Sequence, residues 1–199
     1  TPGPDGVFSF GSLSDPVLND AGQLAFVSFV VDVHGGPNSG ARLFRSDGSI
    51  GSLVTIAREG LQAPDGNGEF SILRDPVLNN AGLTAFNGFL RNTSGGSSDD
   101  DGIYSTDGTA TALVNIVREG QATPDGSGVF ASANTNTLNE SGQVAFVAGV
   151  FGSSGSSGIF RGGGTVGGLV TIARGGQAAP EGNGSFSSFS SNIALNDAG

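Results

Sequence analysis

The sequence predicts an all-β protein made of tandem repeats, each about 60 residues long and each folded as four antiparallel strands. Two observations predict this fold class. Three different motifs recur along the chain with one common period, which is the signature of a repeat architecture. In addition, no stretch places apolar residues at the i, i+3, i+4 and i+7 positions of an amphipathic helix, and the apolar runs are short and separated by glycine-rich turns.

The first motif, Asn-x-x-Gly-x-x-Ala-Phe, predicts a tight hairpin turn. An Asn side chain can accept a hydrogen bond from the backbone two residues on, in an Asx-turn, and Gly tolerates the positive φ that such turns need. The Ala and Phe then begin a strand, and we expect the ring to be buried between neighbouring sheets. The predicted turn residues are Asn19, Gly22, Asn79, Gly82, Asn139 and Gly142, the rings are Phe26, Phe86 and Phe146, and a fourth copy begins at Asn196.

Two further motifs fix the repeat boundaries. Leu-Val-x-Ile-x-Arg-x-Gly occurs at residues 53–60, 113–120 and 169–176, and Pro-[Asp/Glu]-Gly-x-Gly-x-Phe occurs at 64–70, 124–130 and 180–186, with a looser copy at 2–8. The chain therefore divides into repeats at 1–60, 61–120 and 121–176, followed by a partial fourth repeat at 177–199. With four strands in each full repeat and one in the fourth, we expect 13 strands.

Each full repeat contains four strand-like runs, named a to d, which in the first repeat span residues 6–18, 23–31, 41–45 and 53–57. Proline interrupts run a at Pro16 and Pro76, which predicts an edge strand or a bent one. In runs b and d, apolar residues occupy both sets of alternating positions, so both faces of each strand are apolar. This pattern predicts strands buried on both faces. The repeats differ in length only between runs b and c, so we expect exposed loops there that tolerate substitution, including residues 152–158.

The composition removes most kinds of chemical site. The chain has no Cys and no Lys, which excludes thiolate chemistry, Schiff bases and the P-loop lysine. The single histidine, His34, lies in a Gly/Pro loop of one repeat, which disfavours His-centred catalysis. The net charge of −10 disfavours binding to nucleic acid, and no apolar run is long enough to span a membrane. We therefore expect no enzyme activity and no cofactor.

Two sets of charged residues are candidates for binding. The acidic run Asp99, Asp100 and Asp101 could supply oxygen ligands to Ca²⁺, although it lacks the spacing of a calcium loop, and a solvated loop is the favoured interpretation. An arginine recurs at the end of run d and could bind anionic sugars. Its repetition favours a structural ion pair with the acid of the turn that follows. The expected pairs are Arg58 with Asp65, Arg118 with Asp125, and Arg174 with Glu181.

Four short strands and one turn signature per period resemble the blades of a β-propeller. Residues 18–26, Leu-Asn-Asp-Ala-Gly-Gln-Leu-Ala-Phe, look like the Ser-Pro-Asp-Gly-Lys-x-x-x-Phe turn of TolB-type blades. The first motif, together with a Gly-Ile-[Tyr/Phe] strand and Ile-x-Arg-Glu-Gly-x-x-x-Pro, resembles bacterial choice-of-anchor surface proteins with such repeats. That resemblance implies a secreted, extracellular protein with no established activity and no catalytic residue to carry over. Three periods are fewer than the four to eight blades of a closed propeller.

The sequence therefore favours a structural role. We expect a subunit of an extracellular fibre or surface assembly whose copies join head to tail, because the fourth a strand has no complete set of partners within the chain. The expected assembly strand contains Phe186, Phe189, Ile193 and Leu195. We expect its two Phe rings to insert into the neighbouring copy or, if the parent chain is longer, its contact to be with the adjoining repeat. The alternative is a propeller-type module that binds a glycan or another ligand.

Overall fold

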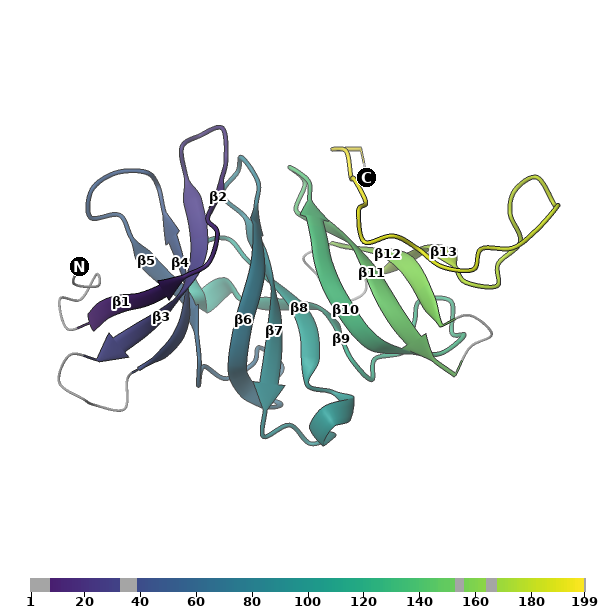
Figure 1. The fold of residues 1–199 in the computed structure, drawn as a ribbon, viewed down its shortest axis with the longest axis horizontal. Coiled ribbons are helices and arrows are strands. Elements are labelled where there is room, and N and C mark those ends of the chain that lie inside the picture. Colours follow the sequence, from purple (N-terminus) through teal and green to yellow (C-terminus); the bar gives the residue numbers. More distant parts are fainter. Residues whose placement is uncertain (1–7, 33–38, 153–155, 164–167, 199) are drawn as a thin grey trace.

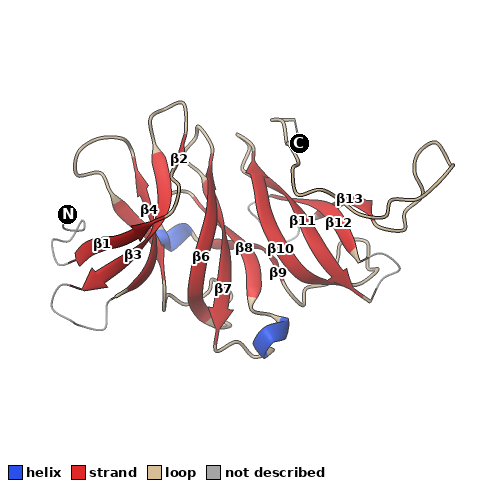
Figure 2. Cartoon of the chain, in the orientation of Figure 1, coloured by secondary structure: helices blue, strands red, loops and turns tan. Residues whose placement is uncertain are grey.

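The protein consists of three antiparallel sheets that follow one another along the chain and lie side by side (Figures 1 and 2). The computed structural model describes residues 8–32, 39–152, 156–163 and 168–198. The first sheet has the order β1-β3-β4-β5, with β2 also paired to β3. Its strands are β1 (Phe8–Leu13), β2 (Val17–Leu18), β3 (Leu24–Asp32), β4 (Gly40–Ser46) and β5 (Val54–Arg58).

The second and third sheets repeat this order with four strands each, β6-β7-β8-β9 and β10-β11-β12-β13. The second sheet contains β6 (Glu69–Leu78), β7 (Thr84–Arg91), β8 (Asp101–Thr106) and β9 (Val114–Arg118). The third contains β10 (Val129–Leu138), β11 (Gln143–Phe151), β12 (Ser157–Gly163) and β13 (Val170–Arg174). The all-β repeat fold predicted from the sequence is confirmed. The helices in the described ranges are two short 3-10 turns, η1 (Gly96–Ser98) and η2 (Ala110–Ala112), and none there is long and apolar enough to cross a membrane.

Run a is both an edge strand and a bent one, as its prolines predict. In the second sheet, β6 lies at the edge and its register with β7 shifts between Arg74 and Val77, where Asp75 has a φ of 51°. In the first sheet the same place, before Pro16, divides the run into β1 and β2. The third sheet keeps a register shift between Thr135 and Thr137 without a proline. The bend therefore belongs to the repeat rather than to the proline alone.

A cluster of three aromatic rings, one from each of strands a, b and c, occupies one face of every sheet. Within each cluster the b and c rings stack with centroids 5.4, 5.8 and 5.7 Å apart in the successive sheets. The a ring meets the c ring edge-on at 5.4, 4.8 and 4.8 Å. The clusters are Phe10, Phe26 and Phe44; Phe70, Phe86 and Tyr104; and Phe130, Phe146 and Phe160.

These aromatic faces hold the sheets together, because each one packs against the aliphatic face of the preceding sheet. The rings of the second sheet pack on Leu43, Ile56 and Ala57 of the first. In the same way, the rings of the third sheet pack on Ile103, Ile116 and Val117 of the second. In the described chain no sheet precedes the first, and its ring Phe26 is only partly buried. The prediction of full burial is therefore right for Phe86 and Phe146 and wrong for Phe26.

Three other sequence predictions need correction. Strand d is buried on both faces at its centre in the first two sheets, but in the third sheet Ile172 is exposed. Loop 152–158 is not freely substitutable at its ends, because Gly152 has a φ of 81° and a Cβ on Gly158 would lie 2.7 Å from the Arg174 side chain. Phe10, and not Phe8, takes the place of Phe70, since Phe10 pairs with Val30 as Phe70 pairs with Leu90.

The fourth run a does not form a strand. The turn before it is built as in the other repeats, with Phe186 N–H donating to Gln177 O at 2.9 Å and one bridge between Ala178 and Ser185. From residue 186 to 195 the chain is then irregular. In the other sheets strand a is held by strand b, and within the described chain no b strand follows this segment. The described residues do contain 13 strands, but the thirteenth comes from the division of the first run a.

The turn glycines lead to a stability prediction. Gly22, Gly82 and Gly142 have φ values of 77°, 85° and 77°, in the region that only glycine adopts without strain. We expect Gly22→Val and Gly82→Val each to lower the free energy of unfolding by more than about 1 kcal/mol in chemical denaturation. Gly184→Val is the matched control, because Gly184 has open space around it and no positive φ. Equal losses at Gly184 and Gly22 would contradict this explanation.

Candidate functional site

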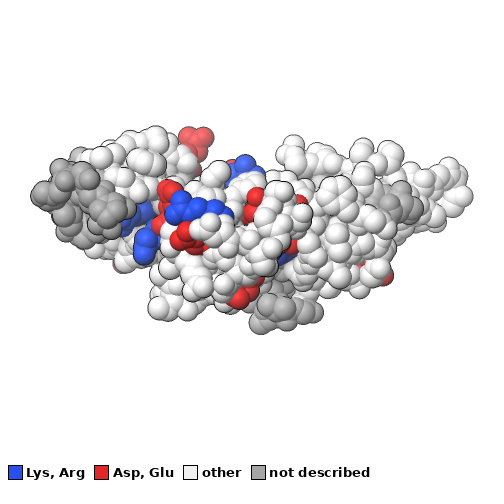
Figure 3. Space-filling model, turned by 90° about the horizontal axis from the view of Figure 1, so that it is seen from below, with Lys and Arg blue, Asp and Glu red and all other residues white. Residues whose placement is uncertain are grey.

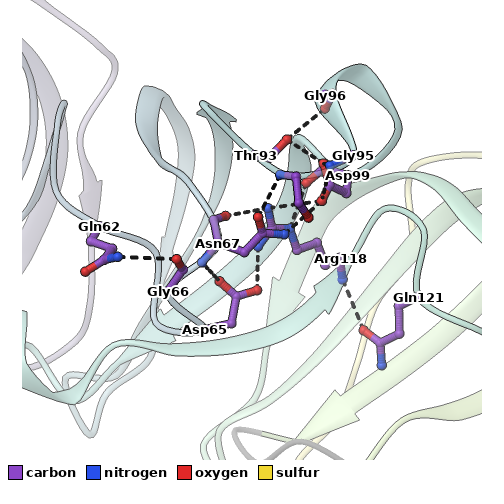
Figure 4. Close-up of polar contacts among 11 residues, drawn as sticks. Gln62, Asp65, Gly66, Asn67, Thr93, Gly95, Gly96, Asp99, Arg118 and Gln121 are labelled. Atoms are coloured by element: carbon purple, nitrogen blue, oxygen red, sulfur yellow. Dashed lines mark hydrogen bonds and ion pairs between the residues drawn. The ribbon is translucent and has the colours of Figure 1, made fainter.

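The junction between the first two sheets carries an ion-pair cluster centred on the buried Arg118, at the end of β9 (Figure 4). Its Nη1 donates to the Asp65 carboxylate, its Nη2 to Asn67 O at 2.7 Å and its Nε to Asp99 O at 2.7 Å. Asp65 and Asn67 belong to the turn that links the two sheets. The arginine therefore links the last strand of the second sheet, β9, to the turn that precedes the first strand of that sheet, β6. We call this arrangement the arginine clasp.

The clasp recurs at the next junction. Arg174 Nη1 donates to the two carboxylate oxygens of Asp125 at 3.2 and 3.1 Å. Arg118 and Arg174 are both buried, whereas Arg58 is exposed and, among the described residues, donates to Glu59 O at 3.2 Å. The predicted pairing with the turn that follows is thus wrong for Arg118 and Arg174, which pair with the turn that precedes their own sheet.

Hydrogen bonds lower the pKa of two carboxyl groups beside the clasp arginines, Asp99 and Asp125. Partial burial raises the pKa of Asp99, but hydrogen bonds from Thr93 (2.5 Å) and Asn67 (2.8 Å) outweigh burial and leave the pKa below its usual value. Asp125 behaves in the same way, because hydrogen bonds from Thr123 and Ser127 lower its pKa more than burial raises it. A depressed carboxyl pKa stabilises the fold above the unfolded-state pKa, and this contribution is lost as the pH falls through the folded-state pKa.

The three acidic residues proposed as calcium ligands point to different partners. Asp99 belongs to the clasp. Asp100 lies beside Glu119, and burial together with the Asp100 charge raises the pKa of Glu119. Asp101 accepts the Ala133 N–H of the next sheet at 3.2 Å. Within the residues that the structure describes, no group of three or more His, Cys, Asp or Glu side chains is arranged to hold a metal ion. His34 lies outside the described residues.

A cavity of about 760 Å³ lies beside the clasp. Polar atoms of Asp65, Asn67 and Gln121 line part of it, and the apolar side chains of Leu113 and Ile116 line the rest. Small-molecule sites in proteins are commonly lined by apolar side chains with a few polar groups among them, as this cavity is.

A second set of contacts links all of the hairpin turns. In the first three turns the Asn Oδ1 accepts the backbone N–H four residues on, at 2.8 Å, instead of two residues on as predicted. Asn196 Oδ1 accepts the Ala198 N–H two residues on, at 3.1 Å, as predicted. The Nδ2 group donates to the carbonyl oxygen of the Asn in the next repeat. These bonds run from Asn19 to Asn79 (2.8 Å), from Asn79 to Asn139 (2.9 Å) and from Asn139 to Asn196 (3.0 Å). We call this series the asparagine ladder.

The residues that follow these asparagines form a parallel series at the surface. Asn80 Oδ1 accepts the Asp20 N–H at 2.8 Å, Glu140 accepts the Asn80 N–H at 3.0 Å, and Asp197 Oδ1 accepts the Glu140 N–H at 3.0 Å. The sequence analysis missed both series. The signal was that position one of the motif is Asn in all four copies. Asp can form an Asx-turn as well as Asn can, but only Asn has the Nδ2 donor that the ladder bond needs.

The terminal segment, residues 186–195, lies against the outer face of the third sheet. Ile193 and Leu195 line a groove of about 350 Å³ together with Ala145, Ile159 and Ile172 of that face. Phe186 and Phe189 contact each other at 5.5 Å between centroids. The four residues predicted for assembly are therefore divided between a ring pair and this groove.

A protein family matches the chain over its full length. Its description is "Family of unknown function (DUF7453)", and its model matches residues 1–199. The chain belongs to this family. No curated protein matches the sequence. Membership of DUF7453 assigns no activity, so the function of this member is argued from its geometry.

The ladder leads to a prediction. Asn79 is buried, and Asn79→Asp removes the Nδ2 donor and places a carboxylate against Asn139 O. We expect a loss of about 1–3 kcal/mol in the free energy of unfolding at neutral pH. Asn80→Asp is the matched control, because that neighbour is exposed and is an acid in the other three copies. Equal effects at the two positions would show that the ladder bond adds nothing.

Asp101 gives a prediction about pH. Burial raises the pKa of Asp101, and its Oδ1 is buried without a hydrogen bond among the described atoms. A carboxyl with a raised pKa destabilises the fold only when ionised, so its cost is absent at low pH and complete above the folded-state pKa. Asp101→Asn should therefore gain stability relative to wild type between pH 3 and pH 7, measured by urea unfolding. A difference that does not change with pH would contradict this.

Proposed function

We propose that this protein is a non-enzymatic structural repeat protein whose copies join head to tail in an extracellular fibre or surface assembly. One observation carries the proposal: the same isoleucine of strand d is 0 % exposed at Ile56, 3 % at Ile116 and 52 % at Ile172. The first two are covered by the rings of the following sheet. Ile172 lies on the equivalent aliphatic face of the third sheet, and no described sheet packs on that face. Such a face is suited to the aromatic face of another sheet.

The terminal segment supports the same proposal. Its end is held in place by the ladder bond from Asn139 to Asn196 and by the bond from Glu140 N–H to Asp197. The b strand of a second copy, β3, would pair with this segment in place of its own β1, so the contact would be a strand exchange. Phe186 would then take the place that Phe10 has beside Phe26. The contact joins two different surfaces, so each added copy leaves a free surface for the next one. The copies then form an open filament unless the rotation between successive copies closes a ring.

Removal of the terminal segment tests this function. We expect the 199-residue chain to form elongated particles in negative-stain microscopy and a concentration-dependent mass in light scattering. The chain with residues 185–199 deleted should remain folded by circular dichroism and should stay at the mass of one copy. Filaments of the truncated chain, or a monomeric intact chain at high concentration, would refute the proposal.

The 760 Å³ cavity favours a second candidate, a module that binds a glycan. Its test is a glycan array with wild type and with Gln121→Ala and Asn115→Ala, which alter the cavity lining without removing the clasp. Binding by wild type that both variants lose, while both remain folded, would favour this candidate over the structural role.

A further inference from the structure

We propose that the cavity beside the Arg118 clasp binds a small organic cation, namely a protonated primary amine on a compact sugar or aliphatic body. The inference goes beyond the structural role and does not depend on it. For the second candidate function, which places a glycan in the same cavity, it specifies that the ligand carries a positive charge. The cavity is lined by residues of the ranges 64–67 and 113–121 and by Asp99, all in the middle of the chain.

The charge of the cavity lining favours a cation. Three carboxylates, from Asp65, Asp99 and Glu119, line the cavity together with one guanidinium, from Arg118. All three nitrogens of that guanidinium already donate hydrogen bonds within the clasp (Figure 4). An anion in the cavity would therefore meet three acidic groups and a guanidinium that is already bound. An ammonium group would meet charges opposite to its own.

Glu119 is the lining acid that the clasp does not pair. Asp65 and Asp99 both lie within 4.0 Å of Arg118. Glu119 forms no ion pair among the described residues, which include all eight arginines of the chain. Asp100 places a second negative charge beside it, and burial together with this charge raises the pKa of Glu119. An ammonium group beside Glu119 would offset the repulsion between the two acids.

An acceptor without a partner lines the same cavity. The Oδ1 atom of Asn115 is buried and has no hydrogen-bond partner among the described atoms. A buried carbonyl oxygen normally accepts a hydrogen bond, and an ammonium group supplies three N–H donors and no acceptor. The equivalent residues of the first and third repeats are Thr55 and Thr171. Strand d therefore does not itself require an amide at this position.

The rest of the lining suits the body of such a ligand. The volume of about 760 Å³ lies within the range of small-molecule sites in proteins. Leu113, Val114 and Ile116 form an apolar wall for the CH groups of a ring or chain. Gln121 Oε1 accepts the Arg118 N–H at 3.2 Å, which orients the amide and leaves its Nε2 as a donor for a ligand hydroxyl group.

Matched pairs of probes test the inference. Glucosamine is compared with N-acetylglucosamine, and butylamine with butanol, by isothermal titration calorimetry of the full 199-residue chain at pH 7. The second compound of each pair keeps the ring or chain and lacks the positive charge. We expect at least one amine to bind about tenfold more tightly than its uncharged partner. The pair that shows this difference identifies the body as a sugar or an aliphatic chain.

Two variants locate the site. Glu119→Gln and Asn115→Thr should each weaken binding of that amine by about tenfold. Asn115→Thr introduces the residue of the other two repeats, so the variant should remain folded by circular dichroism. Asp15→Asn is the matched control for the lost charge, because Asp15 is exposed in the first sheet and does not line the cavity. It should bind the amine like wild type.

The outcomes separate this inference from the proposed functions. If N-acetylglucosamine binds as tightly as glucosamine and butylamine does not bind, the glycan function stands and the inference is overturned. If no amine binds, or if amine binding is unchanged in either cavity variant, the cavity is not a site for organic cations and the inference is overturned. Fibre formation is measured separately by microscopy, so neither result affects the assembly proposal.

Discussion

Replacing Phe86 or Phe146 with Ala is expected to lower the free energy of unfolding by about 3–5 kcal/mol. Both rings are fully buried at the centre of a junction between sheets. Each contacts two other aromatic rings of its own sheet as well as the aliphatic face of the sheet before it. Truncation therefore removes apolar contacts and leaves a cavity that β-sheets on two sides cannot easily close.

Phe26→Ala is the matched control for this prediction. It removes the same side chain at the same repeat position, but Phe26 lies on the first sheet and is only partly buried. Its loss should be clearly smaller in equilibrium unfolding with guanidinium chloride. Equal losses at Phe26 and Phe86 would mean that the rings stabilise their own sheet and do not join neighbouring sheets.

Arg118→Met should have a comparably large effect, about 3–5 kcal/mol, because it leaves a partly buried carboxylate and two carbonyl groups without their donor. Met keeps the apolar stem of the arginine, so the loss reports the guanidinium group rather than packing. Arg58→Met is the control and should cost about 0–1 kcal/mol, since Arg58 is exposed. Thermal and urea unfolding of the two variants compare them directly. If Arg118→Met is as mild as Arg58→Met, the clasp does not stabilise the junction.

The direction of the clasp could not be predicted from the sequence, and the period itself explains why. Arg118 lies 7 residues before Asp125 and 53 residues after Asp65, and those separations add up to one repeat of 60. Every repeat therefore offers each arginine two acids at equivalent positions. Only the packing of sheet on sheet decides between them, so the sequence predicted the right residue types and the wrong partner.

The local elements were predicted better than the contacts between repeats. The positive φ of Gly22 follows from backbone sterics within its turn. The proline of run a marked the place of the bend, although the third sheet bends at the same place without one. The second role of Asn79 and the irregular path of residues 186–195 depend on residues from another repeat. A strand forms only where another strand supplies its hydrogen bonds, so a strand-like sequence was not sufficient at the C-terminal end.

The asparagine ladder and the sheet-on-sheet junctions also determine how the molecule would respond to a pulling force. The main packing contacts join each sheet to its immediate neighbours, so a load applied at the two ends passes through the junctions in series. The junction with the least resistance would open first and release one repeat while the others stay folded. Each release would free about 60 residues, or roughly 200 Å of extended chain. A stack of this kind lengthens in steps and limits the tension that it passes on.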